Sequence, residues 1–218
     1  MDGRVKPGPD AGESLPTQMT IHLETQSDLE EAVHALIKRD PRLKPVLEIA
    51  GMPALRRREP GFTGLAHIVC GQQLSTASAA AIWGRLSAAF DPFDHEAVSR
   101  ARTDRLGRLG LSAAKIKTLK HLAREINAQR LNLDVLAEED AEAAHHTLIA
   151  LPGIGPWTAN YIAMRALRWP DAFPKEDIVV RNNLGGITAR EAEVRSQAWR
   201  PWRSYAVMHI WGIQPPTA

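Results

Sequence analysis

Apolar residues recur every three or four positions along most of this 218-residue chain, the spacing that places side chains on one face of an α-helix. Leu29, Val33 and Leu36 form one such stripe, and Ile116, Leu119 and Leu122 begin another. The strict alternation that is typical of strands is nearly absent, and no Asn-Gly or Asp-Gly pair joins two apolar runs. The pattern therefore predicts an all-α protein.

Polar residues that precede the apolar runs predict where helices begin. Ser27-Asp-Leu-Glu30 and Thr188-Ala-Arg-Glu191 have the spacing of a capping box, in which a hydroxyl and a carboxylate each accept a backbone N–H. Ser75 is expected to cap the alanine-rich run that follows it, and Ser204 to cap the run from Tyr205 to Trp211. Asp40-Pro41 is expected to end the first helix.

Two glycine-containing turns each separate a pair of helical patterns. Gly110-Leu-Ser112 precedes a long helix, and Pro152-Gly-Ile-Gly155 lies between the apolar run at 148–151 and a new run from Trp157. Two glycines so close together allow backbone angles that side chains forbid and leave successive N–H groups uncovered. With the N-terminus of the next helix, this turn suits a phosphate. No strand precedes it and no Lys-Ser/Thr follows, so the phosphate of a nucleic-acid backbone is the better match than a nucleotide.

Charge and cysteine content narrow the class of protein. The formal net charge is only +2, but basic residues far outnumber acids between Arg100 and Arg130, a run that either binds an anion or is a solvated helix face. The single cysteine, Cys70, excludes a disulfide, a zinc site and an iron–sulfur cluster built from cysteines, and its apolar neighbours predict a core position. No secretory signal and no apolar run of about 20 residues occurs, so we expect a cytoplasmic protein without a membrane span.

Four segments together resemble the helix-hairpin-helix/Gly-Pro-Asp superfamily of DNA glycosylases, within it the DNA-3-methyladenine glycosylase II family. The resemblance covers roughly residues 60–215. The segments are Gly71-Gln-Gln-Leu-Ser75, Gly110-Leu-Ser112 with Lys115, Leu151-Pro-Gly-Ile-Gly-Pro-Trp-Thr-Ala-Asn-Tyr161 followed by Asp177, and Trp202-Arg-Ser-Tyr-Ala-Val-Met-His-Ile-Trp211.

The resemblance implies a two-lobed helical fold with the active site in the cleft between the lobes. We expect residues 1–20 to be a disordered tail and residues 21–218 to form the glycosylase domain, its central lobe at about 60–175. The second lobe would combine about 21–59 with 176–218. Too few residues precede Gly71 for the β-rich lobe of some bacterial members, so the compact form is expected.

Asp177 is the expected catalytic residue, because the superfamily's aspartate follows the hairpin at this spacing. Cleavage of an N-glycosidic bond develops positive charge on the sugar, which a fixed carboxylate stabilises while it orients the attacking water. Asp177 is also placed to be a helix N-cap, and both roles are compatible. Trp157 stands where bifunctional relatives carry a nucleophilic lysine, which implies a monofunctional enzyme without lyase activity.

The resemblance also assigns the base pocket and the DNA contacts. Trp157, Tyr161 and Trp211 match aromatic positions that would stack on a cationic alkylated purine; Trp83 and Trp199 are expected in the core, and Trp202 is left open. The expected DNA contacts are Gln72, Gln73, Leu74, Ser75, Lys115, Gly153, Gly155 and Thr158, with Gln73 or Leu74 as the wedge that fills the gap of a flipped base. Main-chain carbonyls of Ile149, Leu151 and Ile154 match positions that hold a monovalent cation, Na⁺ or K⁺.

The sequence thus predicts a monomeric DNA glycosylase, without a required cofactor, that removes alkylated purines such as 3-methyladenine and 7-methylguanine from double-stranded DNA. Its cellular site would be the nucleoid in a bacterium or the nucleus in a eukaryote. Two alternatives stay open: a glycosylase for an oxidised, deaminated or mismatched base, and a non-catalytic DNA-binding protein that uses both hairpins.

Overall fold

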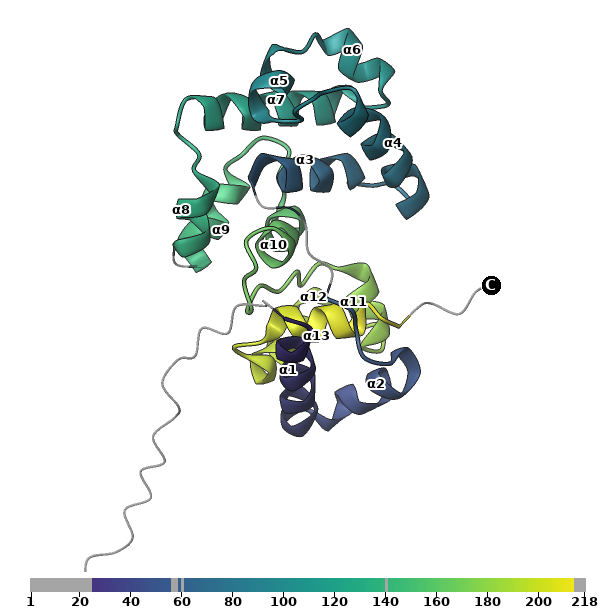
Figure 1. Cartoon of the computed structure of the whole chain (residues 1–218). Coiled ribbons are helices and arrows are strands. Elements are labelled where there is room, and N and C mark those ends of the chain that lie inside the picture. The colour runs from purple at the N-terminus through teal and green to yellow at the C-terminus, as the bar shows by residue number, and fades with distance from the viewer. Residues whose placement is uncertain (1–24, 56–58, 60, 140, 214–218) are drawn as a thin grey trace, which may run out of the picture.

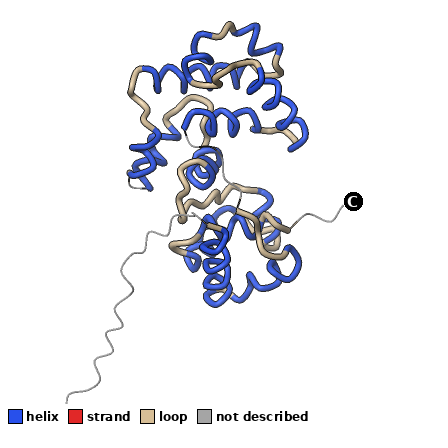
Figure 2. Tube along the Cα trace, in the orientation of Figure 1, coloured by secondary structure: helices blue, strands red, loops and turns tan. Residues whose placement is uncertain are grey.

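The computed structural model describes residues 25–55, 59, 61–139 and 141–213. The expected tail at 1–20 lies outside these residues. Within them the regular elements are α-helices and two short 3₁₀ helices, as Figure 2 shows, so the all-α expectation is confirmed. No described helix is long and apolar enough to cross a membrane. The α-helices are α1 (Gln26–Arg39), α2 (Lys44–Ala50), α3 (Gly61–Gly71), α4 (Thr76–Ala88), α5 (His95–Arg100), α6 (Thr103–Arg108), α7 (Ala113–Asn127), α8 (Leu133–Glu138), α9 (Ala141–Ile149), α10 (Pro156–Arg165), α11 (Ile178–Asn183), α12 (Ala189–Ser196) and α13 (Arg203–Ile210).

The helices form two groups with α10 between them (Figure 1). In one group α7 packs against α3, α5 and α6, and α4 packs against α3. In the other, α13 contacts α1, α2 and α11, so this group joins the first described helices to the last. We propose that these groups are the central lobe at about 60–175 and the second lobe at about 21–59 plus 176–218.

Asp40 anchors the packing of the second group. It ends α1, and its side chain is only 2% exposed beside the fully buried Trp199. The Trp199 indole Nε1 donates to Asp40 Oδ2 at 3.0 Å, and Arg42 Nε donates to Oδ1 at 2.6 Å. Burial alone would raise the pKa of Asp40, but the hydrogen bonds from Arg42 and Trp199 outweigh it and lower the pKa to about 2.

Several expected helix starts are confirmed and two are wrong. Ser75 and the Thr188–Glu191 capping box begin α4 and α12 as expected. The first helix instead begins with a capping box formed by Thr25 and Asp28, so Ser27 lies inside α1. Asp28 stands three residues after Thr25, which gives the same reciprocal geometry two residues earlier in the chain.

Ser204 is the second wrong cap, because α13 already begins at Arg203. Its buried hydroxyl donates to the carbonyl of Trp169 at 2.7 Å and accepts from the Ala172 amide at 2.9 Å. Ser204 therefore fastens the irregular segment between α10 and α11 to α13. The same segment is held by an ion pair between Arg203 Nε and Asp171 Oδ1 at 2.8 Å. These contacts fix the chain that leads to Asp177.

Candidate active site

The hairpin between α9 and α10 has a glycine, Gly153, at a position where a side chain would be strained. Gly153 has φ +83°, in the left-handed region that L side chains rarely adopt. A Cβ at this position would lie 1.9 Å from Oγ1 of Thr118 on α7. The turn therefore packs directly on α7, and this contact fixes its position relative to that helix.

Gly155 differs from Gly153, which corrects the expectation that both glycines supply unusual backbone angles. Its φ of −87° and ψ of 172° are ordinary extended values, and a Cβ there would meet nothing within 4 Å. Gly155 is the N-cap of α10 and provides no side chain to bond the first N–H groups of that helix. The free space and these N–H groups together make the site suited to an anion.

Asp177 is held by two donors from different elements. It is the N-cap of α11, and its Oδ1 accepts the Val180 amide at 2.8 Å. Its Oδ2 accepts the indole Nε1 of Trp157 at 2.7 Å, and the residue is 5% exposed. The N-cap role is confirmed. The nearby Asp171 is already bound by Arg200 and Arg203, which leaves Asp177 as the carboxylate beside the hairpin.

The three aromatic residues expected in the base pocket lie together. The rings of Trp157 and Tyr161 stack at 5.1 Å with an interplanar angle of 21°, one helical turn apart on α10. Trp211 contacts Tyr161 at 5.6 Å with a tilt of 41°. The Arg165 guanidinium lies over the Trp211 ring at 5.3 Å. Segments 50 residues apart in sequence thus form one aromatic cluster.

A cavity of about 910 Å³ opens between α10, α3 and α4. Trp157 and Tyr161 line it, whereas Trp211 does not line it but contacts two lining residues, Tyr161 and Arg165. Trp83 also lines it, half-buried and stacked on His67 at 4.3 Å, so its expected core position is wrong. The other lining residues are Leu55, Ile68, Gly71, Gln72, Gln73, Leu74, Thr76, Ala79, Ala80, Gly84 and Arg165.

Trp199 and Trp202 differ in burial. Trp199 is fully buried, as expected. Trp202 is half-buried, and the Arg39 guanidinium lies 4.7 Å from the centre of its ring. Trp202 therefore belongs to the packing between α1 and α13 rather than to the cavity.

The loop between α3 and α4 is joined to the hairpin by Gln72. Its Nε2 donates to the Gly153 carbonyl at 3.2 Å and to Thr158 Oγ1 at 3.1 Å. These bonds direct Gln72 inward and leave Gln73 and Leu74 as the exposed tip of the loop. Leu74 is 39% exposed, and Gln73 has a left-handed φ of 55°. Ser75 is used as the cap of α4.

Lys115, one of the expected DNA contacts, is half-buried and bonded to α3. Its Nζ donates to the Cys70 carbonyl at 2.8 Å, at the C-terminal end of α3. Burial lowers the pKa of Lys115 and raises the pKa of the Cys70 thiol to about 12, which makes the thiol inert. A cation at the negative end of a helix is stabilising, so Lys115 joins α7 to α3.

The carbonyls expected to hold a monovalent cation belong to the turn of the hairpin. Ile149 is the last residue of α9, and the Leu151 carbonyl accepts the Ile154 amide at 3.0 Å. A carbonyl oxygen has a second lone pair, so this bond is compatible with cation binding. Neutral carbonyl oxygens suit Na⁺ or K⁺. The described residues contain no cluster of His, Cys, Asp or Glu that would suit a transition metal.

Comparison with known proteins identifies the family. Residues 66–204 match the HhH-GPD superfamily base excision DNA repair protein family, and the chain belongs to it. The expected resemblance is thereby confirmed. One relative is the probable bifunctional transcriptional activator/DNA repair enzyme AlkA of Mycobacterium tuberculosis, 36% identical over 203 residues. That match covers 87% of this chain but only 40% of the relative.

Other relatives carry the name of the predicted branch. DNA-3-methyladenine glycosylase 2 of Escherichia coli is 29% identical over 227 residues, covering 91% of this chain and 80% of the relative. The crystal structure of a DNA-3-methyladenine glycosidase from Bacillus halodurans is 28% identical with a TM-score of 0.71, covering 83% of this chain and 87% of that one. A Schizosaccharomyces pombe 3-methyladenine DNA glycosylase in complex with abasic DNA shares the fold, with a TM-score of 0.76 at 22% identity.

Proposed function

We propose that this protein is a monofunctional DNA glycosylase that hydrolyses the N-glycosidic bond of alkylated purines, such as 3-methyladenine and 7-methylguanine, in duplex DNA. The observation that carries the proposal is the placement of Asp177. This nearly buried carboxylate accepts an amide at the start of α11 and the indole N–H of Trp157, and Trp157 itself lines the aromatic cavity next to the hairpin. The family and the names of its relatives support the same reaction.

In the proposed reaction the damaged nucleotide leaves the stack and enters the cavity between α10, α3 and α4. The bond between C1′ and the base breaks, and its electron pair leaves with the base. The Asp177 carboxylate stabilises the oxocarbenium-like sugar and orients a water, whose oxygen bonds to C1′ as its proton is released. The products are the free base and an abasic site in an uncut strand.

The residues at the hairpin and next to Asp177 support hydrolysis over a lyase reaction. Trp157 occupies the hairpin position at which an amine nucleophile would be needed. The lysine nearest in sequence to Asp177, Lys175, is paired with Glu193 at 2.8 Å. A Schiff base with the sugar requires a neutral amine at C1′. We therefore infer that the strand stays intact.

The aromatic cluster supports an electron-poor base as substrate. Cationic purines are attracted to indole and phenol faces by about 0.5–2 kcal/mol for each contact. Such a base is also a good leaving group, so a strong general acid is unnecessary. Trp157 and Tyr161 would contact the base directly, and Trp211 would support Tyr161.

The remaining elements suit a monomer that binds double-stranded DNA. The backbone of Gly153, Gly155 and Thr158 would hold a phosphate, with a monovalent cation at the carbonyls of Ile149, Leu151 and Ile154. Gln73 or Leu74 would fill the gap left by the flipped base. The enzyme would act wherever the cell keeps its DNA.

Release of bases from methylated duplex DNA tests this function directly. The wild type is expected to release 3-methyladenine and 7-methylguanine without cutting the strand. Asp177→Asn, which keeps an equally good N-cap, is expected to lose activity by about 100-fold or more. Glu176→Gln, which alters the exposed neighbouring acid, is the matched control and should match the wild type.

Two results would overturn the proposal: no release of either base by the wild type, or full activity in Asp177→Asn. A panel of oxidised, deaminated and mismatched bases identifies the first alternative by preferential release of one of them. The non-catalytic alternative predicts salt-sensitive binding to duplex DNA and no base release from any substrate.

A further inference from the structure

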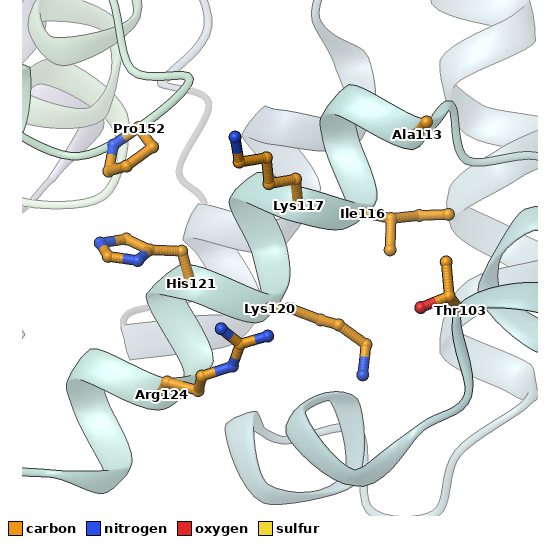
Figure 3. A pocket seen from close by; sticks show the side chains of 8 residues that line it. All are labelled: Thr103, Ala113, Ile116, Lys117, Lys120, His121, Arg124 and Pro152. Atoms are coloured by element: carbon orange, nitrogen blue, oxygen red, sulfur yellow. The ribbon is translucent and has the colours of Figure 1, made fainter.

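A second surface, separate from the aromatic cavity, lies along α7 (Figure 3). It encloses a hollow of about 270 Å³, with Pro152 of the hairpin at one rim and Thr103 at the other. We call it the α7 groove. Its lining residues are Thr103, Ala113, Ile116, Lys117, Lys120, His121, Arg124 and Pro152.

The basic side chains of the α7 groove share one face of the helix. Lys117, Lys120 and Arg124 stand at positions i, i+3 and i+7, which places them within one stripe. The opposite face of α7 is buried through Leu119 and Leu122. At 1.5 Å per residue, the stripe from Lys117 to Arg124 is about 10 Å long. It therefore spans more than one phosphate of a nucleic-acid strand.

No carboxylate of the described residues neutralises this stripe. Lys117, Lys120 and Arg124 form no ion pair within that part of the chain, although Lys120 Nζ donates to the Ser99 carbonyl at 3.1 Å. The two acids nearest in sequence are already paired. Asp104 is bound by Arg102 and Arg108. Glu125 is bound by Arg130. The groove is thus a cationic surface rather than a balanced network.

The α7 groove is continuous with the hairpin, which distinguishes it from an ordinary solvated helix face. Pro152 lines the groove, and the next residue, Gly153, packs against Thr118 in the middle of the basic stripe's helix. An anion at the N-terminus of α10 and an anion in the groove would therefore lie on either side of one rigid turn. A polymer with regularly spaced phosphates matches this arrangement.

We propose that the α7 groove binds further phosphates of the same DNA duplex whose backbone is held at the hairpin. This inference rests on the proposed function for its ligand, double-stranded DNA, and adds a contact surface outside the cavity. Lys117 and Arg124 carry the charge at its two ends. Contacts of this kind position the duplex without reading its sequence.

Salt-dependent binding tests the proposal with a matched pair of variants. The probe is a duplex that carries a tetrahydrofuran abasic-site analogue, so that binding is measured without base release. Lys117→Gln/Arg124→Gln removes two charges from the groove. The control, Lys38→Gln/Arg190→Gln, removes the same two charge types from exposed positions on α1 and α12.

The groove variant is expected to bind several-fold more weakly, and the slope of log K against log salt concentration should fall by about two units. The control should keep the wild-type slope. Shortening the duplex from one end should weaken wild-type binding, while the groove variant should be insensitive to the same shortening. Wild-type affinity and slope in the groove variant would overturn the proposal.

The same variants separate this inference from the proposed function. Single-turnover base release at saturating DNA should be unchanged in the groove variant, because neither residue touches the cavity. If the groove variant has the smaller salt slope but the wild type releases no base, DNA binding by the α7 groove is supported and the glycosylase function is rejected. If the wild type releases the base but the groove variant keeps the wild-type salt slope, the glycosylase function is supported and DNA binding by the α7 groove is rejected.

Discussion

The indole Nε1 of Trp157 donates a 2.7 Å hydrogen bond to Oδ2 of Asp177 and so joins α10 to the start of α11. Trp157 therefore has a second contact besides its stacking on Tyr161. With the Val180 amide on Oδ1, both carboxylate oxygens have a fixed donor. A carboxylate held in this way keeps one orientation, which is what electrostatic stabilisation of a sugar cation requires.

Trp157→Phe separates the two contacts of Trp157. Phenylalanine keeps an aromatic ring against Tyr161 but has no N–H for Asp177. A hydrogen bond to a charged group contributes about 1.5–3 kcal/mol, so the single-turnover rate of base release should fall by about tenfold to 100-fold. Affinity for a duplex with an abasic-site analogue should change little. A wild-type rate in this variant would show that the indole N–H does not position Asp177.

Gly153→Ala is expected to destabilise the protein strongly, whereas Gly155→Ala is expected to leave its stability nearly unchanged. At Gly153 the left-handed φ and the contact with Thr118 make alanine incompatible, which should lower the free energy of unfolding by about 2 kcal/mol or more. At Gly155 the backbone suits alanine and the space is open, so stability should change by less than about 1 kcal/mol.

Urea unfolding and DNA affinity measure the two effects. Gly155→Ala should weaken DNA binding in a stable protein, because its methyl group would lie where the phosphate is expected. Equal stability of the two variants would contradict the packing of the turn on α7. Wild-type affinity in Gly155→Ala would place the phosphate elsewhere.

Gln72→Ala removes the link between the α3–α4 loop and the hairpin. Both of its bonds, to the Gly153 carbonyl and to Thr158 Oγ1, would be lost. We expect a loss of about 1–2 kcal/mol in unfolding free energy and slower base release. Gln73→Ala, at the exposed tip of the same loop, is the control for stability and should unfold like the wild type. Thermal unfolding of Gln72→Ala and Gln73→Ala measures this difference in stability. Equal melting temperatures would show that the two Gln72 bonds do not stabilise the fold.

The features that could be predicted from sequence are those determined by near neighbours. The stripe of Leu29, Val33 and Leu36 indicated α1, and the glycines at 153 and 155 indicated the hairpin. Asp177 was recognisable as an N-cap because the cap and the amide it accepts are three residues apart. Short helices such as α5 and α8, six residues each, have too few turns to show a period.

Contacts between distant segments could not be predicted, because they depend on how each helix is rotated against its neighbours. Lys115 looks like a surface cation until α7 is placed on α3, where its ammonium meets the Cys70 carbonyl. Trp83 has a helical spacing typical of core residues, yet α4 turns it toward the cavity. The Gln72 bonds span more than 80 residues, a separation at which no local pattern applies.

The charge of Asp40 should make the stability of the protein depend on pH. Its pKa is about 2 in the folded protein, against 3.8 for an ordinary aspartate. A group that binds its proton less tightly when folded stabilises the protein above its unfolded pKa, and this stabilisation is lost as pH falls through the folded pKa. The shift corresponds to about 2 kcal/mol at pH 6, falling to about half at pH 3.

Asp40→Asn isolates this contribution, because the amide keeps an oxygen for the Trp199 indole but cannot ionise. The difference in unfolding free energy between wild type and variant, measured with urea, should be largest near pH 6 and should shrink steadily below pH 4. The other acids with lowered pKa values, Asp104, Glu125 and Glu191, are present in both proteins and cancel in this difference. A difference that stays constant from pH 6 to pH 3 would show that the Asp40 charge does not stabilise the second lobe. A shrinking difference would show that the ionised Asp40 carboxylate, bonded by Arg42 and Trp199, stabilises the folded protein.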